Sequence, residues 1–201
     1  MASDGPAWVW IDLEMTGLDP GTCTILEIAS IVTDADLTIL EEGPDLVIHH
    51  SDLVLATMSP WCIEHHGASG LTAASRASNV SLREAEERTL EVIRRHVEAQ
   101  KAPLCGNSVA LDWRFLRVHM PELWRYLDYR LIDVTTVKEL AARWFPNAPQ
   151  PAKAGGHRAL ADIRESIDEL RLYRTNLFRA EPEPASGAEP TGGAGPAGGA
   201  A

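Results

Sequence analysis

The chain has 201 residues, 45% of them hydrophobic, with 29 acidic and 18 basic side chains and a formal charge of −11, as in an acidic globular protein of one or two domains. No apolar run approaches the roughly 20 residues of a membrane-spanning helix, and residues 1–6 lack the apolar core of a secretory signal, so membrane insertion and secretion are not expected. The surplus of acid also disfavours long nucleic acids, whose affinity comes from Lys and Arg along many phosphates, so a nucleic-acid substrate should be short.

The first part of the chain is predicted to form a β-meander. Residues 8–13 form an apolar strand that meets a turn at 16–21, and residues 25–33 continue as an apolar, β-branched run. Two shorter strands are expected at 37–40 and 46–48, because turn-forming residues separate them.

The rest of the folded chain is predicted to alternate helices and strands. Ser81 and Glu84 form an S-x-x-E capping box that begins a helix reaching about Glu98. Other elements are expected from apolar periodicity and from Pro and Gly at their ends: strands at 103–107 and 131–134, and helices at 112–119, 135–144 and 159–177. This order indicates an α/β fold with a mixed sheet flanked by helices.

The end of the chain has a different composition. Residues 181–201 are rich in Gly and Pro and contain no Leu, Ile, Val or aromatic residue, so this tail is predicted to be disordered. After a short N-terminal segment, residues 1–7, a single domain is expected over residues 8–180. The three cysteines are widely spaced and form no C-x-x-C pair, so buried free thiols are expected rather than disulfides or a zinc site.

Two acids in the first strand, Asp12 and Glu14, interrupt an apolar run. Residues two apart on a strand point to the same side, where two carboxylates repel each other unless a cation lies between them. Oxygen ligands of this kind suit Mg²⁺ or Mn²⁺. A solvated strand face is the alternative explanation of this short pattern.

Asp112, His157 and Asp162 are the other candidates for chemistry. Asp112 begins a helix just after a strand, the position of an N-cap residue or of a ligand site at a sheet edge. Asp162 lies on the first turns of the last helix, five residues after His157, which follows two glycines. The imidazole could reach a metal held by Asp162, and a satisfied surface or core histidine is the alternative.

These five residues, in this order and spacing, resemble the site of the DEDD-type 3′→5′ exonucleases of the histidine subclass. Longer strings, above all WIDLEMTGLD at 10–19 and HRALADIRES at 157–166, are similar to the oligoribonuclease family within that class. The resemblance spans about residues 8–178 and implies an RNase H-like exonuclease fold with a mixed five-stranded sheet. It also implies a metal-dependent enzyme that removes 5′-mononucleotides from very short RNAs, with dinucleotides preferred.

The same resemblance implies roles for the five residues. Asp12, Glu14, Asp112 and Asp162 would hold two Mg²⁺ or Mn²⁺ ions, with Asp12 bridging both, and the ions would clamp the attacking and leaving oxygens of the phosphodiester. His157 would take the proton from the attacking water, a step that suits an imidazole with an ordinary pKa of about 6.5.

Seven further positions match substrate contacts of the family: Leu18, Trp61, His66, Ser108, Tyr129, Arg130 and Thr135. Leu18 would wedge against a base and Trp61 would stack on one. Without the resemblance, Leu18 could instead close the turn and Trp61 could belong to the core. His66, Ser108 and Arg130 would contact the 5′ phosphate. Arg130 would reach in from the second subunit of a homodimer together with its neighbour Tyr129, so activity would require the dimer.

Three positions depart from the family pattern: Leu111, Trp113 and Thr135. They bear on substrate fit and remove no metal ligand. Two other functions fit less well, because an exonuclease for DNA or longer RNA calls for a basic stripe, and a non-catalytic binding module would lack one of the five site residues. The cytoplasm is the expected location, with an organellar mature form as the alternative.

Overall fold

The structure of the protein is a computed structural model that describes residues 7–149 and 158–178. Three predictions fall outside the described residues, wholly or almost so: the N-terminal segment 1–7, the placement of His157 beside the acids, and the disordered tail at 181–201.

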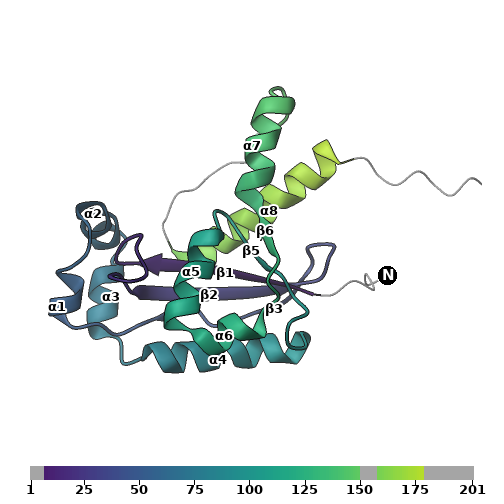
Figure 1. The fold of residues 1–201 in the computed structure, drawn as a ribbon. Helices are drawn as coiled ribbons and strands as arrows, with labels where there is room; N and C mark the ends of the chain where they lie inside the picture. Colours follow the sequence, from purple (N-terminus) through teal and green to yellow (C-terminus); the bar gives the residue numbers. More distant parts are fainter. Residues whose placement is uncertain (1–6, 150–157, 179–201) are drawn as a thin grey trace, which may run out of the picture.

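A single mixed sheet runs through the molecule (Figure 1). Its strands are β1 (Trp8–Met15), β2 (Ile25–Thr33), β3 (Ile39–Glu42), β4 (Leu46–Val47), β5 (Leu104–Gly106) and β6 (Leu131–Asp133). The order is β3-β2-β1-β5-β6, with β1 to β3 antiparallel and β5 and β6 parallel to β1. The predicted α/β sheet is confirmed, and among the described residues it has six strands rather than five because the short β4 also pairs with β2.

The helices are α1 (Asp52–Leu55), α2 (Pro60–Ala68), α3 (Leu71–Ala77), α4 (Leu82–His96), α5 (Ala110–His119), α6 (Pro121–Tyr126), α7 (Val134–Trp144) and α8 (Ala159–Leu177). Each of the four predicted helices is present, with ends at most two residues from those expected. In α4 the Ser81 hydroxyl accepts a hydrogen bond from the Glu84 amide, as the capping box predicts. Helices α1, α2, α3 and α6 were not predicted, because they are too short to show a helical period.

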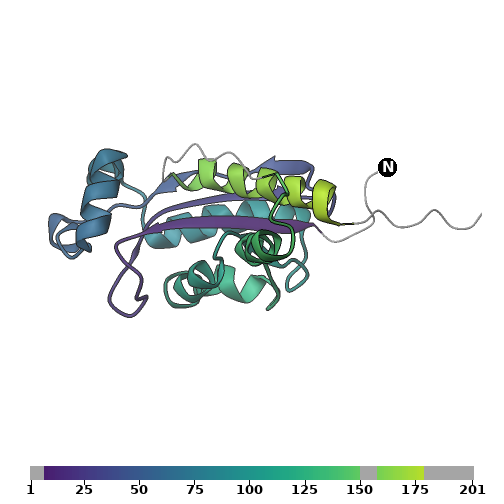
Figure 2. The ribbon, with the colours of Figure 1, turned by 90° about the horizontal axis from the view of Figure 1, so that it is seen from above.

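Side chains of β1 alternate between two cores. Val9, Ile11 and Leu13 belong to the larger core, which lies under α4, α5 and α6. Trp10 faces the other way, into the core beneath α7 and α8. Figure 2 shows α8 on one side of the strands and α5 and α6 on the other. Asp12 and Glu14 share the parity of Trp10, so they lie on the α8 side of the sheet.

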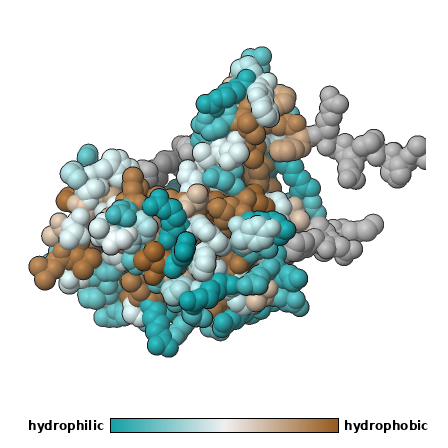
Figure 3. All heavy atoms as spheres, in the orientation of Figure 1, coloured by the Kyte–Doolittle hydropathy of each residue, from teal (hydrophilic) through white to brown (hydrophobic). Residues whose placement is uncertain are grey.

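Helices α1 to α3 stand at one end of the sheet, around a small core of their own (Figure 1). Exposed apolar side chains gather on this end and along α7, as Figure 3 shows in brown. Within the described ranges no helix combines the length and the hydropathy that crossing a membrane requires. Cys23, Cys62 and Cys105 are free thiols, as predicted, with the last two buried and Cys23 partly exposed.

Candidate functional site

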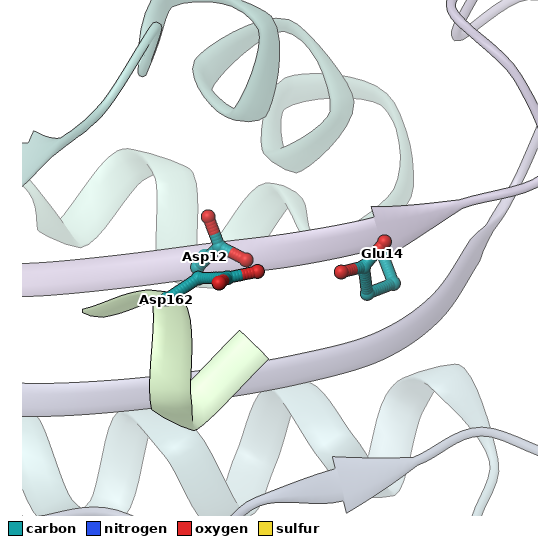
Figure 4. Close-up of side chains that lie close together, drawn as sticks. All are labelled: Asp12, Glu14 and Asp162. Carbon is teal, nitrogen blue, oxygen red and sulfur yellow. The ribbon is translucent and has the colours of Figure 1, made fainter. Parts of the chain in front are cut away.

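Three carboxylates from two distant parts of the chain meet above β1. Asp12 and Glu14 project from β1 toward α8, and Asp162 projects from the first turns of α8 toward them (Figure 4). One oxygen of each carboxylate lies within 4.8 Å of the others. Glu14 is buried, while Asp12 and Asp162 are partly exposed, so the cluster opens to solvent on one side.

Asp112 lies beside this cluster rather than within it. Strand β5 ends at Gly106, so β1 runs on beyond its parallel partner and the Leu13 amide has no strand to bond. The Asp112 carboxylate, on the first turn of α5, accepts a hydrogen bond from that amide at 3.1 Å. Of the four predicted acids, the structure therefore brings three together and holds the fourth against the same strand through one oxygen.

Burial and mutual repulsion shift these acids toward the protonated form. Burial is the main cause that raises the pKa of Asp12 well above its usual range, and the charges of Asp112, Glu14 and Asp162 add to it. Burial, followed by the charge of Asp162, raises the pKa of Glu14 to about 7. Burial raises the pKa of Asp112 to about 8, although backbone hydrogen bonds oppose the shift. Carboxylates that repel each other in a partly dry pocket are a donor set for hard divalent cations.

An ion pair between a buried acid and a partly exposed arginine, which the sequence did not suggest, lies next to the cluster. Glu27 on β2 stands directly across from Glu14 on β1, and its side chain is fully buried. Arg158, the residue before α8, pairs with it, with 2.7 Å between Nη2 and Oε1. The available signal was a single charged residue, Glu27, inside a nine-residue strand of mostly apolar residues.

His66 approaches the acids from α2. Its Nε2 lies 2.9 Å from the Met15 carbonyl oxygen, and its Nδ1 lies 3.9 Å from an oxygen of Glu14. The Ser59 hydroxyl caps α2, and the Ser59 amide bonds the Thr16 carbonyl at the end of β1. The start of α2 is thus attached to the strand that carries the acids.

Two apolar side chains predicted to contact bases are exposed near this end of β1. Leu18, in the turn after β1, is 73% exposed, and Trp61, on the first turn of α2, is 52% exposed. The Trp61 ring stacks on His65 with 3.8 Å between ring centres, and it lies nearly perpendicular to the His66 ring, with 6.5 Å between their centres. Trp61 therefore does not have the core role that was its alternative explanation, while Leu18 lies in a turn, as its alternative explanation expected.

The turn after β5 is built around Ser108, a non-glycine residue with φ of 52°. Its amide donates to the Asp133 carboxylate and to the Thr135 hydroxyl, each at 2.9 Å. The Thr135 hydroxyl also donates to the Asn107 side chain. These bonds offset the cost of a left-handed backbone and fix Ser108 just before the helix that carries Asp112.

Tyr129 and Arg130 lie apart from the acids. They precede β6, at the end of the parallel strands opposite to Ser108 and Asp112, which follow β5. Tyr129 is 75% exposed, and the Arg130 guanidinium lies over its ring, 4.9 Å from the centre. Within one chain, the structure therefore does not bring Arg130 to the carboxylates.

Leu111 and Trp113, which flank Asp112, pack against the larger core. The Trp113 ring lies 5.6 Å from that of Trp124, between their centres. Their departure from the family pattern therefore concerns packing between α5 and α6 on the face away from the acid cluster.

Comparisons with known proteins agree with this geometry. A family model described as exonuclease (RNase T) matches residues 9–170. The chain is 51% identical to the oligoribonuclease of Marinobacter nauticus over 178 residues, which cover 88% of this chain and 99% of that protein. It is 54% identical to the oligoribonuclease of Pseudomonas putida, over 85% and 96% of the two chains. It is 51% identical to the mitochondrial oligoribonuclease of Homo sapiens, over 85% and 73%.

Among solved structures, the chain resembles exonuclease I. A structure titled exonuclease I (apo) matches with a TM-score of 0.67 at 16% identity, over 87% of this chain and 43% of that one. The zinc-bound complex of E. coli exonuclease I with single-stranded DNA gives a TM-score of 0.68 at 17% identity, over 85% and 41%. The chain thus spans less than half of exonuclease I, and at these identities the likeness concerns the fold.

Proposed function

The chain belongs to the oligoribonuclease family of exonucleases and is a hydrolytic 3′→5′ exoribonuclease, and from this premise we propose that it degrades very short RNAs, above all dinucleotides, to 5′-mononucleotides. The single observation that carries the proposal is the meeting of Asp12, Glu14 and Asp162 beside Asp112. The domain proposed to do this is the predicted unit of residues 8–180, of which the family model matches 9–170.

Divalent cations are the cofactor that these residues fit. Asp12, Glu14 and Asp162 would hold Mg²⁺ or Mn²⁺, and Asp112 would complete a two-ion site through its second oxygen. Bound there, the ions would neutralise the acids and stabilise charge on the attacking and leaving oxygens of the phosphodiester. The raised pKa values of Asp12, Glu14 and Asp112 support this proposal, because the pocket favours a positive charge, either protons or metal.

His157 is proposed as the general base, although it lies outside the described residues. The support comes from its place in the chain, directly before Arg158 and five residues before Asp162. Arg158 directly precedes α8, and Asp162 lies in the first turn of α8, within the acid cluster. An imidazole in this position would take the proton of the attacking water near neutral pH.

The surroundings of the acids support the proposed substrate contacts. The exposed side chains of Leu18 and Trp61 would hold bases by wedging and stacking, which is worth about 1–3 kcal/mol per base whatever its identity. Ser108 and His66 would contact the 5′ phosphate, and Thr135 would orient the Ser108 backbone for it.

Arg130 and Tyr129 are proposed to act in the second subunit of a homodimer. The support is their place at the opposite end of the strands from Ser108, with the Arg130 side chain 67% exposed. A guanidinium from the partner would bind the 5′ phosphate in a bidentate manner and leave no space for a third nucleotide.

The acidic surface and the relatives bear on substrate length and location. Few phosphates are touched in a dinucleotide, so the charge of −11 is compatible with RNA hydrolysis. We propose a cytoplasmic location, and the relatives include bacterial proteins as well as proteins named mitochondrial in mouse, cattle and human.

A length series tests the proposed function. The full chain is incubated with 5′-phosphorylated RNAs and DNAs of two to ten nucleotides, with Mn²⁺ or with EDTA. We expect the diribonucleotide to be hydrolysed fastest and EDTA to abolish turnover. Equal turnover of dimer and decamer, or faster cleavage of DNA, would favour the rival exonuclease function, and no turnover of any substrate would favour a binding module.

A further inference from the structure

We propose that Glu27 is a positioning residue of this site: paired with Arg158, it fixes the first turn of α8 and thereby holds the Asp162 carboxylate against Asp12 and Glu14. The inference rests on the proposed function, because it concerns the residues that would hold the metal. It adds a residue of β2 to a site otherwise formed by β1, α5 and α8.

The contacts of Glu27 occupy both of its oxygens. Arg158 Nε lies 2.9 Å from Oε1 and 3.2 Å from Oε2, and Arg158 Nη2 lies 2.7 Å from Oε1. The Ala159 amide, the first of α8, donates to Oε2 at 3.3 Å. Glu27 therefore provides the N-terminal cap that the side chain of Arg158 does not provide, and its negative charge lies at the positive end of the helix.

This cap determines where Asp162 lies. The Asp162 amide donates to the Arg158 carbonyl at 3.0 Å, so the two residues are joined by the first turn of the helix. One turn further on, the Ser166 hydroxyl donates to the Asp162 carbonyl and accepts from Asn107. The segment that carries Asp162 is thus attached to β2 at one end and to the turn after β5 at the other.

Glu27 is distinct from the metal-ligand set. Its side chain is fully buried, whereas the cluster of Asp12, Glu14 and Asp162 opens to solvent. Arg158 already balances its charge, which matters because Glu27 stands directly across from Glu14. Asp45 lies close to both members of the pair, 3.8 Å from Arg158 Nη2 and within hydrogen-bonding reach of the Glu27 carboxylate. Glu27 is therefore suited to hold the start of α8 in place and not to bind the metal.

The chain offers a matched control on the same helix. Arg164 of α8 pairs with Glu42 of β3, with 2.6 Å between Nη2 and Oε2, and both side chains are well exposed. This pair also joins α8 to the sheet through an Arg and a Glu, but it touches neither the helix N-terminus nor the acids. Glu42→Gln therefore removes an ion pair of α8 without releasing the first turn.

The test measures metal binding in the parent protein, Glu27→Gln, Glu42→Gln and Asp12→Ala. Mn²⁺ is titrated into each full chain by calorimetry, and the Mn²⁺ dependence of diribonucleotide turnover is followed separately. We expect Glu27→Gln to weaken Mn²⁺ binding by about 10–100-fold, the usual effect of losing a residue that orients a ligand. For Glu27→Gln, half-maximal turnover should need correspondingly more Mn²⁺, and the KM for the diribonucleotide should be unchanged at saturating Mn²⁺. The Mn²⁺ affinity of Glu42→Gln should stay within about twofold of that of the parent.

Arg158→Lys serves as a second variant if Glu27→Gln does not fold. It keeps the charge but loses the two-point contact, so a smaller loss of Mn²⁺ affinity is expected. A folded Glu27→Gln or Arg158→Lys with a lower melting temperature and the Mn²⁺ affinity of the parent would assign Glu27 to stability alone and overturn the inference. If the parent binds no Mn²⁺, or Asp12→Ala binds it equally well, the proposed function fails together with the inference.

Discussion

At the scale of single residues, the site is a set of acids that are unfavourable together without a counter-charge. Burial is the largest cause of the raised pKa values of Asp12 and Asp112, and neighbouring carboxylates add to both shifts, Asp112 to that of Asp12 and Glu14 to that of Asp112. Residues of this kind are retained in a fold at a cost in stability. This cost has a functional explanation if the acids bind a divalent cation, because the bound cation would attract the carboxylates that otherwise repel each other.

Mn²⁺ affinity should therefore rise between pH 6 and pH 8. The pKa of Glu14 is raised to about 7 and that of Asp112 to about 8, so an ion binding below these values must first displace protons. Calorimetry at pH 6, 7 and 8 measures both the affinity and the protons released. An affinity that is constant over this range would contradict the assignment of these acids as ligands.

The stability of the metal-free protein should change in the opposite direction. Because the folded state raises these pKa values above those of the unfolded chain, it binds more protons, and the contribution of these acids to stability is greatest below the unfolded value of about 4. Stability is then lost as the pH rises through the folded values of about 7 and 8. Melting curves in EDTA, recorded beside the calorimetry, check the same shifts independently.

At the scale of elements, the helices differ in what caps their first turn. Helix α4 is capped by its own Ser81, whereas α6 and α8 depend on acids from other elements. Glu86 of α4 accepts hydrogen bonds from the Glu122 and Leu123 amides at the start of α6, at 2.6 and 2.9 Å. Such caps attach one helix to another and fix the angle at which the chain enters the next element.

Glu86→Ala should destabilise the protein by about 1.5–3 kcal/mol, because a buried, charge-assisted pair of hydrogen bonds is lost. Glu87→Ala is the control, since the adjacent Glu87 is exposed and pairs with Arg83 one turn earlier, a contact worth under about 1 kcal/mol. Urea unfolding measures both variants, and diribonucleotide turnover should be unchanged in each. Equal destabilisation by the two substitutions would show that the cap contributes nothing.

At the scale of the whole molecule, one chain does not hold all the proposed substrate contacts at one place. Arg130 and Ser108 lie at opposite ends of the parallel strands β5 and β6. If both contact the same 5′ phosphate, Arg130 must come from another copy, as the homodimer proposal requires.

Subunit mixing tests this arrangement. Asp12→Ala and Arg130→Ala chains are each expected to be nearly inactive on the 5′-phosphorylated diribonucleotide when purified alone. Co-expressed in equal amounts, they should recover about a quarter of the parent activity, because half of the dimers are mixed and each mixed dimer holds one complete site. If purified mixed dimers recover no activity, Arg130 does not act on the site of the partner subunit. It would then act on the site of its own subunit or have no role in the reaction.

The sequence by itself determined the features that depend on neighbours along the chain. Capping at Ser81 and the apolar periods of 159–177 predicted helices that the structure confirms, and the alternation of β1 placed Asp12 and Glu14 on one face. The family motifs also identified Asp112 and Asp162 as partners, although local chemistry alone could not bring them to β1.

Only the tertiary structure decided the contacts between distant segments. That β5 ends early, and so leaves the Leu13 amide to Asp112, depends on strand pairing. That Glu27 caps α8 depends on which helix packs above β2. No local pattern encodes such contacts, because an acid looks the same in a sequence whether it will be exposed, paired or bound to a metal. Only packing supplies the partner that makes its burial tolerable.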